Sequence, residues 1–134
     1  MKAIDILNSK KLKRTSCREG IIDVVLSTDT ALSENEIRSR LSGTYDRTTY
    51  YRSFKTLEEH KILHKIVVDD QTVKYALDNS FTHKNEHAHF FCNECQMVKC
   101  LESYPLKDFS LPEGYTKNDT EIIIKGTCSG CNKG

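Results

Sequence analysis

Apolar side chains recur at helical spacing in the first half of the chain, which predicts amphipathic helices. The clearest stripe is Tyr50, Phe54 and Leu57, at i, i+4 and i+7 of a helix over residues 46–61. Asp46 is a residue type that caps the start of such a helix. An earlier helix over residues 11–27 has its apolar stripe at Cys17, Ile21, Val24 and Val25, so Cys17 is interpreted as a buried thiol.

A short helix is predicted between these two. Ser33 and Glu36 have the spacing of a capping box, and Ile37 and Leu41 follow as its apolar residues. Gly43 is suited to end this helix.

Two alternating runs come next, over residues 62–68 and 72–77. Asp69, Asp70 and Gln71 lie between them as a turn, so the runs predict a β-hairpin. Three helices followed by a two-stranded hairpin are typical of a winged helix-turn-helix.

A polar stretch over residues 78–85 then breaks the pattern and predicts a hinge. Three short apolar runs beyond it, at 87–92, 97–101 and 121–125, predict strands, and 104–111 is compatible with a short helix. The predicted fold class is α+β. It comprises an N-terminal winged helix-turn-helix over residues 1–78 and a small zinc-stapled α/β domain for dimerisation over residues 79–134.

Composition supports a globular protein of 134 residues, with 37% hydrophobic and 29% charged residues. No apolar run approaches the roughly 18 residues of a membrane span, and the first twelve residues lack a signal-peptide core. We therefore expect a cytoplasmic protein without a membrane partner.

The net charge of +1 does not point to any particular kind of binding partner. Residues 10–18, however, contain five cationic side chains and no acidic residue. By itself this cluster fits a solvated helix face as well as a nucleic-acid contact. Its members are Lys10, Lys11, Lys13, Arg14 and Arg18.

Four of the six cysteines form two C-x-x-C pairs, Cys92 with Cys95 and Cys128 with Cys131. Each pair can supply one edge of a metal tetrahedron, and four thiolates leave no open position, as in a structural Zn(II) site. Four separate core thiols or a redox pair are the alternatives. In a reducing compartment, metal binding is a better expectation than disulfides.

A second group of potential ligands accompanies the first pair. His87 and His89 share one face of their predicted strand, and two imidazoles on one face can chelate Zn(II), Fe(II), Ni(II) or Mn(II). Cys100, with His83 or Glu102 beside it, completes a candidate regulatory site. Cys100 is also explained by packing and Glu102 by solvent exposure, and we interpret His60 and His64 as surface residues.

In three stretches the chain resembles the ferric uptake regulator (Fur) family: residues 12–18, residues 49–54 against the family's T-V-Y-R-x-L, and residues 87–95 as H-x-H-x-x-C-x-x-C. The resemblance implies a homodimeric, metal-dependent repressor that acts on a palindromic operator in double-stranded DNA. It also implies DNA contacts by Tyr51 and Arg52 and a regulatory role for His87 and His89. Structural zinc would be held by Cys92, Cys95, Cys128 and Cys131.

The chain departs from the family where regulatory ligands are expected. Residues 30–33 lack a histidine, Cys100 stands where a carboxylate is usual, and His83 stands where a carboxylate usually precedes the H-x-H. A further site of the family fails because Ala88 has no ligand atom. Sulfur in place of oxygen favours Zn(II) over Fe(II), Mn(II) or Ni(II) as the regulatory metal.

Because residues 49–54 resemble the family's DNA-binding motif, the basic cluster is better explained by contact with DNA than by a solvated surface. Tyr51, Arg52 and Lys55 lie off the buried stripe and are expected in the major groove. The other cations are expected on phosphates, where they supply salt-dependent affinity. They are Lys10, Lys11, Lys13, Arg14, Arg18 and Arg47.

Two other functions remain open at this stage. One is a DNA-binding regulator with only a structural zinc, controlled by oxidation of Cys100 or Cys17 or by no ligand. The other is a zinc-ribbon-like protein adaptor. No glycine-rich phosphate loop or paired-carboxylate motif is present, so we expect neither an enzyme nor a small-molecule substrate.

Overall fold

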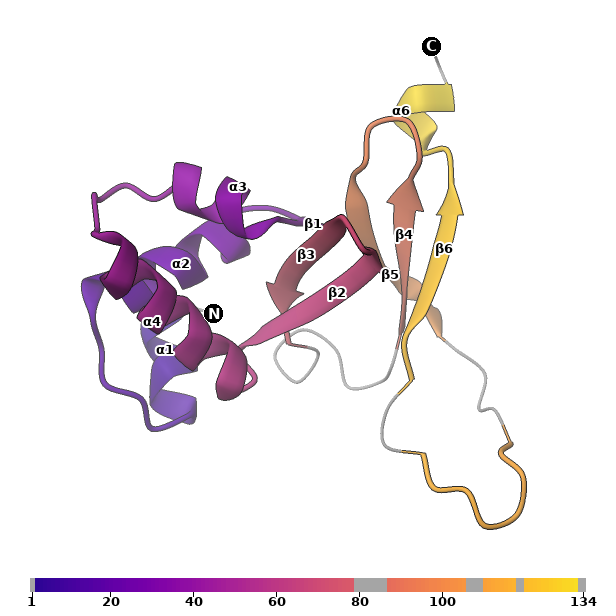
Figure 1. The fold of residues 1–134 in the computed structure, drawn as a ribbon, viewed down its shortest axis with the longest axis horizontal. Helices are drawn as coiled ribbons and strands as arrows, with labels where there is room; N and C mark the ends of the chain where they lie inside the picture. Colours follow the sequence, from indigo (N-terminus) through magenta and orange to yellow (C-terminus); the bar gives the residue numbers. More distant parts are fainter. Residues whose placement is uncertain (1, 79–86, 106–109, 118–119, 133–134) are drawn as a thin grey trace.

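The N-terminal helices gather at one end of the computed structural model and a sheet stands at the other, with a hairpin between them (Figure 1). The structure describes residues 2–78, 87–105, 110–117 and 120–132. The helices of the first unit are α1 (Ala3–Ser9), α2 (Ser16–Leu26), α3 (Glu34–Ser39) and α4 (Arg47–Glu59). The hairpin, called the wing below, consists of β2 (Leu63–Asp69) and β3 (Thr72–Leu77).

The helices pack around one apolar core, as the stripes predicted. Tyr50, Phe54 and Leu57 of α4 are all buried in it, together with Cys17 and Ile21 of α2. The winged helix-turn-helix of the predicted fold class is confirmed.

Helix boundaries differ from the prediction at local backbone features. The helix predicted over 11–27 begins only at Ser16, because Lys11 has a left-handed φ of 57° and Thr15 caps the new start by accepting from Arg18 N at 3.1 Å. The cations at positions 10–14 therefore lie in the connection between α1 and α2. They do not form a helix face, which corrects that interpretation of the cluster.

Two helix ends also differ. The short helix α3 stops at Ser39 with Arg40 as its C-cap, so Gly43 lies beyond the end that was assigned to it. α4 stops at Glu59, two residues short of the prediction, and Lys61 has a φ of 58° that the helix cannot continue. The helix α1 was not predicted, although its buried residues Ala3, Ile6 and Leu7 have helical spacing, because seven residues are too few for a periodic pattern to stand out.

The C-terminal unit is a four-stranded sheet of β1 (Thr30–Ala31), β4 (His87–Cys92), β5 (Val98–Pro105) and β6 (Ile122–Gly126), in the order β1-β5-β4-β6. Its central strands are antiparallel, with His89 opposite Cys100, and β6 runs parallel to β4 with Ile123 beside His89. The helix considered for 104–111 is absent where the structure describes it, since β5 continues through Pro105 and residues 110–111 are not helical; residues 106–109 lie outside the description. The short helix α6 (Ser129–Asn132) follows β6.

The strand β1 comes from the first unit but belongs to the sheet of the second. Thr30 pairs with Lys99 and Ala31 with Val98, and the next residue, Leu32, forms an isolated bridge with Tyr75 of the wing. The sheet therefore contains a strand from the predicted domain 1–78.

The wing packs on one face of this sheet. Ile66 of β2 is buried in a small apolar cluster with Ala31, Phe91 and Val98. Val68, Ala76 and Ile123 pack against that cluster. Alternation along β2 directs His64 to the same side as Ile66, so the wing presents a histidine to the sheet. Among the described residues, no helix is long and apolar enough to cross a membrane.

An ion pair joins the wing to α3. Lys74 Nζ lies 2.7 Å from Glu36 Oε1, and the same carboxylate accepts from Ser33 N at 3.0 Å in the predicted capping box. Partial burial alone would raise the pKa of Glu36, but hydrogen bonds from Lys74 and Ser33 outweigh it and hold the pKa below its ordinary value of 4.5.

This pKa shift makes the stability depend on pH in a defined direction. A carboxyl with a lowered folded pKa stabilises the protein above its unfolded pKa, and the gain is lost as pH falls through the folded value. We expect Glu36→Gln to lower the free energy of unfolding by under about 1 kcal/mol at pH 7, because the pair is partly exposed. Chemical denaturation at several pH values should show this difference shrinking below pH 4.5. A difference that grows at low pH would contradict the assignment.

Candidate metal centres and the recognition helix

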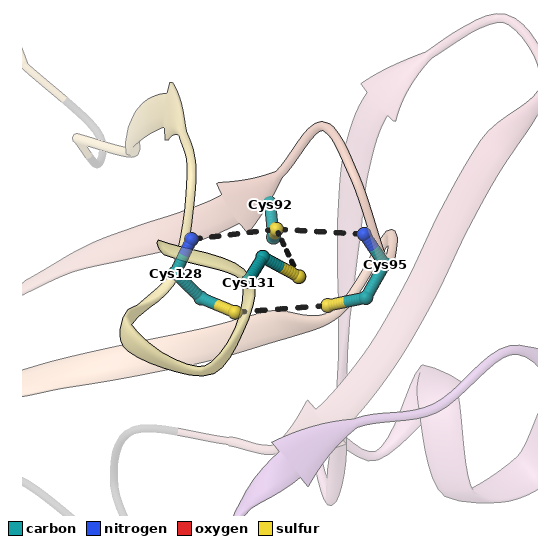
Figure 2. A group of neighbouring side chains, drawn as sticks. All are labelled: Cys92, Cys95, Cys128 and Cys131. Carbon is teal, nitrogen blue, oxygen red and sulfur yellow. Dashed lines mark hydrogen bonds between the residues drawn. The ribbon is translucent and has the colours of Figure 1, made fainter. Parts of the chain in front are cut away.

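The four paired cysteines converge at one end of the C-terminal sheet (Figure 2). Cys92 is the last residue of β4, Cys95 lies in the turn that follows it, and Cys128 and Cys131 follow β6. Parallel pairing of β4 with β6 places Cys92 beside Gly126, so both segments leave the sheet at the same end. The turn between the first two cysteines closes with a bond from Gln96 N to Cys92 O at 2.8 Å.

The sulfur separations match a tetrahedral zinc site. Cys92 Sγ lies 3.7 Å from Cys131 Sγ, and Cys95 Sγ lies 3.8 Å from Cys128 Sγ. Four sulfurs at about 2.3 Å from one ion are about 3.8 Å apart. All four cysteines are free thiols in the structure, so these distances fit metal ligands better than disulfides.

Backbone donors favour the thiolate of Cys92. Its Sγ accepts from Cys95 N at 3.5 Å and from Cys128 N at 3.4 Å, and these bonds lower the pKa of Cys92 to about 6. The neighbouring side chains of Cys128 and Cys92 raise the pKa of Cys131 to about 12. A cation is the simplest means of keeping all four sulfurs deprotonated in so small a volume.

A second donor group forms where the wing meets the sheet. His64 Nε2 lies 2.8 Å from Glu121 Oε1, and His89 Nε2 lies 3.6 Å from the same oxygen. The two imidazole rings stack with centroids 5.9 Å apart. One ligand atom from each of these three residues lies within 4.8 Å of the other two, which is compact enough for one divalent ion.

Cys100 touches the opposite edge of one of these rings. Its Sγ lies 3.4 Å from His89 Nδ1, whereas Glu121 faces Nε2. An ion held through Nε2 would leave Cys100 as the partner of the other ring nitrogen, a position that orients a ligating histidine.

Of the regulatory site predicted from the sequence, the structure describes the side chains of His89 and Cys100. His89 and Cys100 are in contact. His83 lies outside the described residues, and for His87 and Glu102 only the backbone, on β4 and β5, is described.

Sequence reasoning missed two members of the donor group. His64, interpreted as a surface residue, is half-buried and bonded to Glu121, which was not singled out. Alternation of His64 with Ile66 on β2 was the available signal. His60 is exposed at the end of α4, as expected.

The recognition helix α4 exposes the residues predicted to meet DNA. Arg47, Tyr51, Arg52 and Lys55 are all exposed, on the side of α4 away from the core. Asp46 caps the helix by accepting from Thr49 N, and this backbone bond lowers the pKa of Asp46.

The remaining cations lie around the start of α2. Arg18 Nη1 donates to Lys13 O at 2.8 Å and so shapes the preceding connection, while Arg14 forms an ion pair with Glu19. Lys11 and Lys13 are exposed, and Lys10 is half-buried.

Comparisons with known proteins agree with this architecture. The Francisella tularensis ferric uptake regulator with iron superposes with a TM-score of 0.65 at 23% identity, covering 90% of this chain and 95% of that chain. A zinc uptake regulator complexed with zinc and DNA gives 0.67 at 20% identity, covering 98% and 91%. The Helicobacter pylori ferric uptake regulator gives 0.64 at 17% identity, covering 98% and 95%.

These likenesses establish the shared fold. The model of the ferric uptake regulator family matches residues 9–122, which include α2, α3 and α4, the wing and the first cysteine pair. The chain therefore belongs to the ferric uptake regulator family.

Proposed function

We propose that this protein is a metal-dependent, DNA-binding transcription regulator whose regulatory ion binds between the wing and the C-terminal sheet. The main observation is that β2 of the wing supplies His64 to a donor group whose other members come from the C-terminal unit: His89 lies on β4, and Glu121 directly precedes β6. An ion at this point is held by both units at once. Its affinity is therefore highest when the wing lies on the sheet, which is the condition for linkage between metal and DNA.

The donor chemistry favours a borderline divalent ion. Two imidazoles and one carboxylate occur in Zn(II) sites and also suit Fe(II). We propose Zn(II) ahead of Fe(II), Mn(II) and Ni(II), with Cys100 holding the His89 ring through its other nitrogen. His83, His87 and Glu102 remain proposed ligands from the sequence. The four-cysteine group is proposed to hold a separate structural Zn(II).

DNA binding is proposed to use a homodimer that represses from a palindromic operator. A single recognition helix covers little DNA, so we expect a two-fold symmetric dimer whose two recognition helices contact two half-sites. Arg52, Tyr51 and Lys55 of α4 would enter the major groove. The division into a DNA-binding domain at 1–78 and a metal-binding and dimerisation domain at 79–134 belongs to the same proposal.

The test removes one donor at a time. Glu121→Ala and His64→Ala are expected to lower exchangeable Zn(II) from one ion per chain to none, while the structural ion stays. In the wild-type protein, Zn(II) is expected to raise the affinity for DNA about 5- to 150-fold, and this effect should disappear in the variants that have lost the exchangeable ion. A chelator competition series with metal analysis, followed by fluorescence anisotropy on a selected operator, measures both. His60→Ala is the matched control, because His60 is exposed four residues from His64.

The outcomes separate the competing proposals. If His87→Ala and Glu102→Ala abolish the exchangeable ion while Glu121→Ala does not, the regulatory site is the one predicted from sequence. If DNA binding ignores added metal but responds to oxidation of Cys100, the redox alternative is correct. An absence of salt-sensitive DNA binding would contradict the regulator itself and favour the adaptor.

A further inference from the structure

Two arginines and two tyrosines form a continuous ladder across α3 and α4. Arg38 Cζ lies 5.4 Å from the ring centroid of Tyr50, and the rings of Tyr50 and Tyr51 meet edge-on at 5.4 Å and 70°. Arg47 Cζ then lies 5.5 Å from the ring centroid of Tyr51. Each distance is within the range at which these contacts are attractive.

The inner ring of the ladder is fixed by the protein. Tyr50 is 1% exposed, and its hydroxyl donates to Glu34 O at 2.9 Å. It stands where the family motif T-V-Y-R-x-L has valine, so its ring is a departure in this chain. A buried, hydrogen-bonded ring gives Tyr51 a rigid edge to rest on, which valine would not provide.

The outer pair of the ladder faces solvent at the start of the helix. Tyr51 is 37% exposed, and Arg47 is the first residue of α4, four positions before it. N-terminal residues of a recognition helix are the ones that contact base edges. A guanidinium held over a ring also keeps its planar fork and loses little freedom on binding.

We propose that Arg47 and Tyr51 act as one base-reading unit, in which Arg47 selects a guanine next to the base that Tyr51 contacts. This assignment replaces the phosphate contact expected for Arg47 from the sequence, and it rests on the proposed DNA-binding function. Arg47 donates two parallel N–H bonds from its rigid planar fork to the guanine edge, whereas lysine has a single ammonium nitrogen on a flexible stem and no such fork.

The test selects DNA from a random duplex library with the full chain loaded with Zn(II). Arg47→Lys keeps the charge and removes the fork. It is expected to lose about tenfold or more in preference for guanine at one position per half-site, with the salt dependence of affinity unchanged. Tyr51→Phe retains the ring and should retain that preference. Tyr51→Ala should weaken it although Arg47 is still present, and circular dichroism verifies folding of each variant.

Two results would overturn the proposal in distinguishable ways. If Arg47→Lys leaves every base preference intact and Arg47→Ala weakens all sequences equally while lowering the salt slope by about one, Arg47 contacts a phosphate. If the wild-type protein itself selects no sequence, the proposed function fails, and this reading unit fails with it. Lys13→Ala, in the connection before α2, is the control for a phosphate-type response.

Discussion

Replacing Cys92 with serine is expected to abolish binding of the proposed structural Zn(II), the inert ion of the four-cysteine group, and to unfold the C-terminal sheet. Cys92 is fully buried, and its sulfur accepts backbone bonds from both Cys95 and Cys128, so it joins the two metal-binding segments even before an ion is counted. In small metal-dependent domains the binding free energy, on the order of 10 kcal/mol, is folding free energy. Metal analysis and hydrogen exchange across β4 and β6 measure the loss.

A matched cysteine separates this effect from loss of any buried thiol. Cys17 is also buried, but in the helical core and away from the cluster. Cys17→Ala should keep one inert zinc per chain and cost only about 1 kcal/mol of stability. Retention of the inert ion by Cys92→Ser, with an unchanged unfolding midpoint, would show that the four sulfurs do not share a metal.

Replacing Ile66 with alanine is expected to lower the free energy of unfolding by about 2–5 kcal/mol. Ile66 is fully buried between the wing and the sheet, where its removal leaves a cavity bordered by Phe91 and Val98. The same change should weaken the exchangeable metal, because His64 lies two residues earlier on the same face of β2. Denaturant unfolding and metal competition on the same preparation test both effects.

The neighbouring residue provides the control. Val67 is 50% exposed on the opposite side of β2, so Val67→Ala should change stability by under about 0.5 kcal/mol and leave metal affinity alone. If both variants lose the same stability, the wing does not pack on the sheet as described. If Ile66→Ala loses stability but binds metal normally, His64 is not a ligand of that ion.

Local features of the fold were predictable because they depend on neighbouring residues. The capping residues Ser33 and Asp46 each accept the backbone N–H expected from their spacing. The buried stripe of α4 and the hairpin turn followed from periodicity in the same way. The paired cysteines also had their spacing written in the sequence, and the structure brings their sulfurs together.

The contacts between the two units were not predictable from local pattern. His64 and Glu121 are 57 residues apart, and neither lies in a motif that announces the other. The strand β1 has only two residues, too few to show any alternation. Such features depend on how the wing settles on the sheet, a tertiary arrangement that periodicity does not encode.

The pairing of Thr30 and Ala31 with β5 restricts movement of the helical unit relative to the C-terminal sheet. One residue, Leu32, separates them from Ser33, the N-cap of α3, and their partners on β5 end one residue before Cys100. Rotating the helical unit relative to the sheet would therefore break the backbone pairing between β1 and β5 and expose the buried side chain of Ala31. The helical unit is attached to the sheet at two described places, through β1 and through the packing of the wing. Its orientation relative to the sheet therefore depends on this two-residue strand as well as on the wing.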